Sequence, residues 1–132
     1  MRYILDTHSF LWALFSPEKL STWASKEIQD RENEVVLSVV SFWEISLKYA
    51  LGKLELANTE PEELPEAAEL MGLEILLLRP VEAASFHKLP RIAHKDPFDR
   101  LIIWQAIQHK MTLISRDRQF KVYGKFGLKS RW

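Results

Sequence analysis

The stretch Val35-Val36-Leu37-Ser38-Val39-Val40 decides the fold class of this 132-residue chain. It is apolar except for one serine, and a run of this length without polar alternation is typical of a strand buried on both faces. Such strands belong to parallel sheets that carry helices on both sides. Ser41 follows at once and is predicted to start a helix that ends near Leu51, before Gly52.

Other short apolar segments are predicted to be strands of the same sheet. They are residues 2–5, 73–78 and 112–115, and a short edge strand is predicted near Phe126 to Leu128. The segments between them have helical periodicity: residues 8–15, 21–31, 61–71, 81–89 and 96–110. Because strands that alternate with helices indicate βαβ units, we expect one domain over residues 1–132. The predicted fold is a three-layer α/β/α sandwich with a mostly parallel central sheet of four or five strands.

The composition excludes several classes of protein. Without cysteine there are no disulfides, thiolate metal sites or cysteine nucleophiles. Lys plus Arg and Asp plus Glu are 18 each, which argues against a protein that binds nucleic acid by charge alone. The basic end of the chain is either a solvated tail or a phosphate-steering surface; its cations are Lys121, Lys125, Lys129 and Arg131. Neither a membrane span nor a signal peptide is evident, so we expect a cytoplasmic protein.

Acidic side chains lie where predicted strands end or where the following helices begin. These residues are Asp6, Glu44, Asp96, Asp99 and Asp117. Ligands of open α/β sheets bind beyond the carboxyl ends of the strands. We therefore expect these carboxylates to share one edge of the sheet although they are far apart in sequence.

Each of these acids also has a purely structural explanation. Asp96 before Pro97 is a typical helix N-cap. Ser41 and Glu44 have the spacing of a capping box, and Glu44 with Lys48 would form a surface pair. The other acids would each hold a turn or a helix start.

The combination favours a metal site over these separate roles. The acids adjoin core-forming segments, and clustered, partly buried carboxylates repel one another and lose hydration. A hard cation such as Mg²⁺ or Mn²⁺ relieves both penalties. The four histidines show no metal-binding spacing; His94 is predicted to lie at the surface, near the cluster.

Four segments of the chain resemble the motifs of PIN-domain ribonucleases of the VapC toxin type. They are ILDTH (4–8), SVVSFWEI (38–45), HKDPFDRLI (94–102) and LISRDRQF (113–120). The resemblance implies a parallel α/β/α sandwich and an acidic site for Mg²⁺ or Mn²⁺. It also implies that the metal-binding and catalytic residues are Asp6, Glu44, Asp99 and Asp117, with Glu44 bound directly or through water. Ser115, where the family often has Thr, and Asp96 would support the site.

The resemblance further implies cleavage of RNA, a cognate antitoxin protein as partner, and a homodimer. One alternative is a catalytically silent PIN-like domain that binds protein or RNA, with the acids retained for capping. A second is phosphoryl transfer through Asp6 as nucleophile. It is disfavoured because His8 stands where such phosphatases carry another Asp.

Overall fold

The chain forms a single parallel sheet, and the computed structural model describes all of residues 1–132. The strands are β1 (Arg2–Leu5), β2 (Glu34–Ser38), β3 (Glu74–Leu76), β4 (Thr112–Ile114) and β5 (Lys129–Arg131). Their order is β3-β2-β1-β4-β5, and every neighbouring pair is parallel. The predicted α/β class is confirmed, with five strands.

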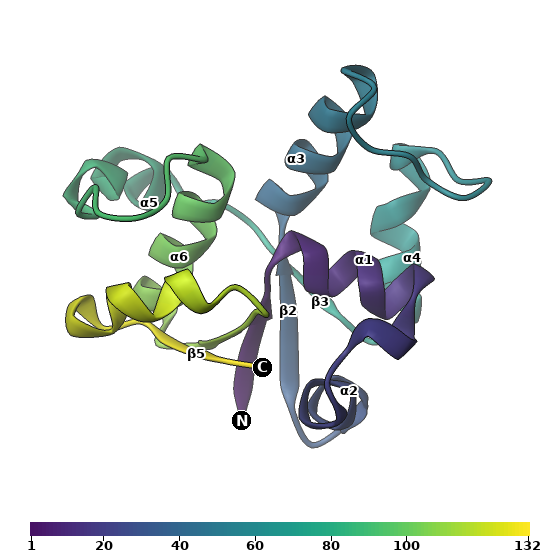
Figure 1. Cartoon of the computed structure of the whole chain (residues 1–132), viewed down its shortest axis with the longest axis horizontal. Coiled ribbons are helices and arrows are strands. Elements are labelled where there is room, and N and C mark those ends of the chain that lie inside the picture. The colour runs from purple at the N-terminus through teal and green to yellow at the C-terminus, as the bar shows by residue number, and fades with distance from the viewer.

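Helices cover both faces of this sheet. They are α1 (Thr7–Phe15), α2 (Thr22–Gln29), α3 (Val39–Ala50), α4 (Leu64–Leu70), α5 (Pro80–Ser85) and α6 (Pro97–His109). Short 3₁₀ helices span Pro17–Lys19, Pro61–Glu63, Phe86–Lys88 and Arg118–Phe126. In Figure 1, α1, α2 and α4 lie on one side of the strands and α5 and α6 on the other. None of the helices has the length and apolar character that a membrane crossing requires.

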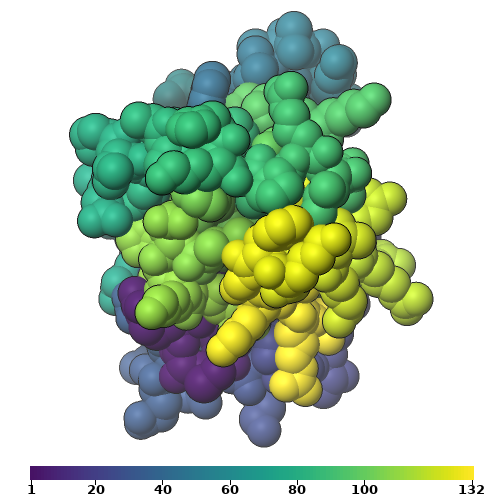
Figure 2. Space-filling view, turned by 90° about the vertical axis from the view of Figure 1, so that its left-hand side faces the viewer, coloured from purple at the N-terminus to yellow at the C-terminus, as the bar shows by residue number.

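Two hydrophobic cores separate the three layers. Alternate residues of a strand point to opposite faces, so Ile4 of β1 packs in the core beneath α6, while Tyr3 and Leu5 pack in the core beneath α1, α2 and α4. Figure 2 shows the two ends of the chain, purple and yellow, close together on one face. This arrangement brings the ends of β1 and β4 side by side although one follows the other by more than 100 residues.

The predicted boundary between β2 and α3 is wrong. The strand ends at Ser38, whose hydroxyl accepts a hydrogen bond from the backbone N–H of Val40 at 3.1 Å and caps the helix. Valine fits both a strand and the start of a helix, so the apolar run alone does not mark the junction. The helix therefore begins at Val39 rather than Ser41. The predicted capping box does not exist, and Glu44 lies in the second turn of α3.

The predicted edge strand is also displaced along the chain. The 3₁₀ helix Arg118–Phe126 ends at Gly127, whose φ of 102° is a conformation that favours glycine. The strand then starts at Lys129, so Phe126 ends the 3₁₀ helix and residues 127–128 form the turn that precedes β5. The strand predicted over residues 73–78 is shorter, Glu74–Leu76.

Candidate active site

The acidic residues of β1, α3 and α6 gather at the carboxyl edge of the sheet. Asp6 directly follows β1, and Ser115 directly follows the neighbouring β4. Glu44 reaches the same edge from α3, which continues β2 without a loop. Asp99 lies in the first turn of α6. The predicted gathering of residues distant in sequence is therefore present for these side chains.

Asp6 is buried and held at both carboxylate oxygens. Oδ1 caps α1 by accepting a hydrogen bond from the backbone N–H of Ser9 at 2.8 Å. Oδ2 accepts one from the hydroxyl of Ser115 at 2.6 Å. Burial raises the pKa of Asp6 above its ordinary value, and the hydrogen bonds from Ser115 and Ser9 oppose that rise. The predicted supporting contact of Ser115 within the site is present.

Glu44 is only 2% exposed and is bound from two sides. The hydroxyl of Thr7 donates a hydrogen bond to Oε1 at 2.6 Å, and Oε2 forms an ion pair with Lys48. The i, i+4 pair that the sequence suggests is real, but it is not a surface pair because its carboxylate is buried. Burial tends to lower the pKa of Lys48, but the hydrogen bond and charge of Glu44 outweigh it, so this pKa is raised.

Asp96 combines the predicted capping role with a contact to the site. Its Oδ1 accepts hydrogen bonds from the backbone N–H groups of Phe98 at 2.8 Å and Asp99 at 3.4 Å, which confirms it as the N-cap of α6. Its Oδ2 lies 3.6 Å from Nζ of Lys48. Lys48 thus connects α3 with the start of α6.

Asp99 has a strongly raised pKa. Burial raises its pKa, and the nearby negative charges of Glu44, Asp96 and Asp6 raise it further, to about 7. Lys48 opposes this shift but does not cancel it. The carboxylate of Asp99 accepts no hydrogen bond from the protein. It is therefore the one acid in the group whose charge is left without a partner.

Asp117 lies at the rim and has a different set of partners. Its Oδ1 accepts a hydrogen bond from the backbone N–H of Gln119 at 2.9 Å and caps the 3₁₀ helix, while Oδ2 lies 2.9 Å from Nε2 of His94. The backbone N–H of Asp117 donates to Ser115 Oγ at 3.0 Å. The side chain of His94 is 6% exposed and packs on Phe120, so the predicted surface position of this histidine is wrong.

The residue types at the acidic edge suit a hard divalent cation, although their side chains are not arranged around one point. As the side chains lie, no three Asp, Glu or His residues are placed to hold one ion. Asp6, Glu44 and Asp99 nevertheless offer the oxygen ligands that Mg²⁺ and Mn²⁺ prefer. Burial raises the pKa of Asp6, and burial together with repulsion from neighbouring acids raises that of Asp99; a bound cation would relieve both effects.

Sequence reasoning missed Thr7 and took the pair of Glu44 and Lys48 for a surface pair. Thr7 and Lys48 both bind Glu44, and the hydroxyl of Thr7 lies 3.0 Å from that of Ser41. The position of Thr7 immediately after Asp6, and that of Lys48 one turn after Glu44, indicate that both residues lie near the site. Their contacts with other elements were not readable, because they depend on how α1, α3 and α6 pack together.

Comparison with known proteins gives matches along nearly the whole chain. A family model described as PIN domain matches residues 3–125. Ribonuclease VapC22 of Mycobacterium tuberculosis is 30% identical over 118 residues, covering 89% of this chain and 88% of the relative.

Solved structures share the fold at lower sequence identity. The chain superposes on a structure of VapBC2 from Rickettsia felis, bound to a DNA fragment from its promoter, with a TM-score of 0.71 and 20% identity over 100% of this chain and 99% of that one. A structure of VapBC-1 from nontypeable Haemophilus influenzae gives a TM-score of 0.66 and 18% identity, covering 99% and 97%. At such identities the likeness shows the fold alone, a PIN-like α/β/α sandwich.

Proposed function

Because the chain belongs to the PIN domain family, we propose that it is a metal-dependent endoribonuclease that acts in the cytoplasm as the toxin of a toxin–antitoxin pair. One observation carries the proposal. Acids separated by more than 90 residues meet at the carboxyl edge of the sheet and leave Asp99 with a pKa of about 7. A pKa raised this far by burial and by neighbouring acids, at a functional edge of the sheet, favours a catalytic role over capping alone.

The proposed cofactor is Mg²⁺ or Mn²⁺, held by Asp6 and Asp99, with Glu44 bound directly or through water. When bound, the ion supplies positive charge that lowers the pKa of a water molecule and offsets charge on the scissile phosphate. Ser115 and Ser9 orient the carboxylate of Asp6, and Thr7 orients that of Glu44. We assign Asp117 a rim position, in which it holds His94 and the following helix, with a weaker part in metal binding.

A hollow beside the site favours a polyanion such as RNA as the substrate. This basic hollow, of about 630 Å³, adjoins Ser115 and Asp117; its cations are Arg116, Arg118, Lys121 and Arg131. Trp132 lines it too, and its ring lies 5.7 Å from that of Trp12. Cations beside partly exposed rings suit single-stranded nucleic acid, because the cations bind phosphates and the rings stack on bases.

RNA cleavage with and without EDTA tests the enzyme assignment. We expect wild type to cleave only with Mg²⁺ or Mn²⁺, and Asp6→Ala and Asp99→Asn to lose cleavage by at least a hundredfold while staying folded. Glu66→Gln, which neutralises an exposed acid of α4, should cleave like wild type. A folded Asp99→Asn protein with full activity would show that Asp99 has no role in catalysis.

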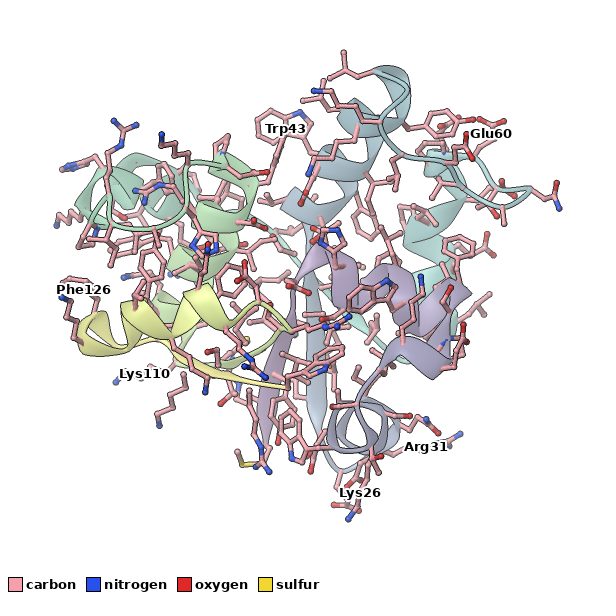
Figure 3. The ribbon with its side chains drawn as sticks, viewed as in Figure 1. Lys26, Arg31, Trp43, Glu60, Lys110 and Phe126 are labelled. Carbon is pink, nitrogen blue, oxygen red and sulfur yellow. The ribbon has the colours of Figure 1, made fainter.

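The basic hollow is tested with a charge-matched pair of variants. Arg116→Ala combined with Arg118→Ala should raise KM for single-stranded RNA by roughly tenfold with little change in kcat. The control removes the same number of cations, Lys26 and Arg31, from beside α2 at the opposite edge of the sheet (Figure 3). Equal effects of the two double variants would show that only net charge matters.

A catalytically silent interaction domain is the second candidate. Asp6, Asp96 and Asp117 each cap a helix, and no three acids are arranged for an ion. This function predicts no Mn²⁺ binding in calorimetry and no EDTA-sensitive cleavage. Either positive result excludes it.

The proposed partners are a cognate antitoxin and a second copy of the chain. Solved structures with this fold include VapBC assemblies. On α3 and its C-cap, three apolar residues lie at i, i+4 and i+8 and are 60%, 40% and 58% exposed: Trp43, Leu47 and Leu51. Such a stripe suits a homodimer contact. Leu47→Glu should yield a monomer by light scattering, whereas Leu70→Glu, on α4, should not change the mass.

A further inference from the structure

Lys48 is the cation that lies inside the acidic edge. Its Nζ pairs with Oε2 of Glu44 on the same helix and lies 3.6 Å from Oδ2 of Asp96, which belongs to the start of α6. The side chain of Lys48 is 33% exposed, whereas that of Glu44 is only 3% exposed. Lys48 therefore shields a buried carboxylate and is not a freely solvated surface cation.

We propose that Lys48 is a built-in cation of the candidate metal site, which holds Glu44 and Asp96, so that a single divalent ion binds Asp6 and Asp99 directly and Glu44 only through water. This inference rests on the proposed metal-dependent function and goes beyond it, because it assigns the number of ions and a role to a residue outside the acidic set. Lys48 is a positioning residue here.

The argument follows from charge. Exposed ion pairs contribute little to the free energy of folding because water screens them. A buried carboxylate without a cation, in contrast, is strongly unfavourable. Glu44 has Lys48 and the hydroxyl of Thr7 as its partners. A second divalent ion at Glu44 and Asp96 would either displace the ammonium group of Lys48 or lie next to its positive charge. Both are unfavourable at such short distances.

The geometry also divides the acids into two groups. Glu44 and Asp96 contact Lys48 directly, while Asp99 has no hydrogen-bonding partner and Asp6 is held by hydroxyl and backbone donors. In Figure 3, α3 and the start of α6 lie side by side, with Trp43 of α3 directed toward α6. The Trp43 and Phe98 rings are 4.9 Å apart. This packing fixes the distance that Lys48 spans.

The experiment is calorimetric titration of the full chain with Mn²⁺, using wild type, Lys48→Met and Lys53→Met. Lys53 is an exposed lysine just beyond the same helix and is the matched control. We expect wild type and Lys53→Met to bind one Mn²⁺ per chain. Lys48→Met should bind Mn²⁺ about tenfold more tightly, or bind a second ion, because its acids lack the competing charge.

Thermal unfolding in EDTA gives a readout independent of metal binding. Lys48→Met should unfold several degrees below wild type, since Glu44 loses its cation, and saturating Mn²⁺ should restore most of the difference. Lys48→Arg keeps the charge and should retain the wild-type ion number and affinity. If Lys48→Met does not fold, a Lys48→Arg protein with altered ion number or affinity still overturns the inference.

The failures of the two proposals are distinguishable. Two Mn²⁺ ions bound to wild type, or an unchanged or weaker affinity in Lys48→Met, would overturn the role of Lys48 and leave the metal-dependent function intact. Absence of Mn²⁺ binding in both wild type and Lys48→Met would overturn the metal-dependent function and this inference with it.

Discussion

The hydroxyl of Ser115 lies 2.6 Å from Oδ2 of Asp6 and joins the end of β4 to the end of β1 across 109 residues of chain. The same hydroxyl accepts the backbone N–H of Asp117. Ser115 therefore orients a buried carboxylate and fixes the turn that leads to the rim of the site.

Removal of this hydroxyl should change the pH profile of the enzyme. The hydrogen bond from Ser115 lowers the pKa of Asp6 against the effect of burial, so in Ser115→Ala that pKa rises and the acidic limb of RNA cleavage moves to higher pH. Loss of the bond should also cost about 1–2 kcal/mol of unfolding free energy. Ser115→Thr keeps the hydroxyl and is the control. An unshifted profile in Ser115→Ala would mean that Asp6 ionisation does not limit cleavage.

Asp99 should make the metal-free protein less stable as the pH rises. Its pKa of about 7 in the folded chain exceeds the ordinary 3.8, so between these values the folded state binds more protons than the unfolded one. The unfolding free energy therefore falls as pH rises from about 4 to about 7. Asp99→Asn should be inactive yet more stable than wild type, by roughly 2 kcal/mol in EDTA at pH 8, with little difference at pH 4. Urea unfolding at both pH values measures this; equal stability at pH 8 contradicts it.

Stabilisation by Mn²⁺ should depend on pH for the same reason. An ion must displace the proton of Asp99, so binding weakens below the pKa of that carboxyl. We expect 1 mM Mn²⁺ to raise the unfolding temperature clearly at pH 8 and much less at pH 5.5. In Asp99→Asn the shift should be small at both pH values. A shift of equal size at the two pH values would show that Asp99 does not bind the ion.

The buried carboxylate of Glu82, between α5 and α6, should act on stability alone. Glu82 is 1% exposed and accepts hydrogen bonds from Arg79 and Gln105, and His109 lies 2.8 Å away. Burial tends to raise the pKa of Glu82, but these partners outweigh it, and the pKa is lowered. Its stabilisation is therefore present above the ordinary value of 4.5 and lost as the pH falls through the folded-state pKa.

Glu82→Gln should thus cost about 2–3 kcal/mol at pH 7 and less at pH 3. Urea unfolding measures the loss, and kcat for RNA should be unchanged because Glu82 does not contact the candidate site. Glu69→Gln, an exposed acid of α4, is the control. A loss of the same size at pH 3 and pH 7 would rule out ionisation of Glu82 as its cause.

Local signals in the sequence sufficed for much of the fold. The Asp96-Pro97 start of α6 was predicted correctly because a cap is made by neighbouring residues. The start of α3 was misplaced because Val39 and Val40 suit a strand as well as a helix, and Ser38 rather than Ser41 supplies the cap. The position of β5 depended on where Gly127 ends the preceding helix.

The contacts of the candidate site were less predictable than its location. The rule that ligands bind beyond parallel strands placed Asp6, Glu44 and Asp99 at one edge. It did not distinguish Asp117 from these three acids. Asp117 contacts His94 at the rim of the site, and this contact requires the loop before α6 to fold over the 3₁₀ helix. Nor did it reveal that Lys48 reaches Asp96, because that distance is set by the packing of α3 against α6.

The central position of β1 between β2 and β4 has a consequence for synthesis of the chain. Asp6 is translated more than 100 residues before the neighbouring strand β4 and before Ser115, its hydroxyl partner. A nascent chain that has not yet reached β4 and Ser115 therefore carries Asp6 without the strand and the side chain that orient it.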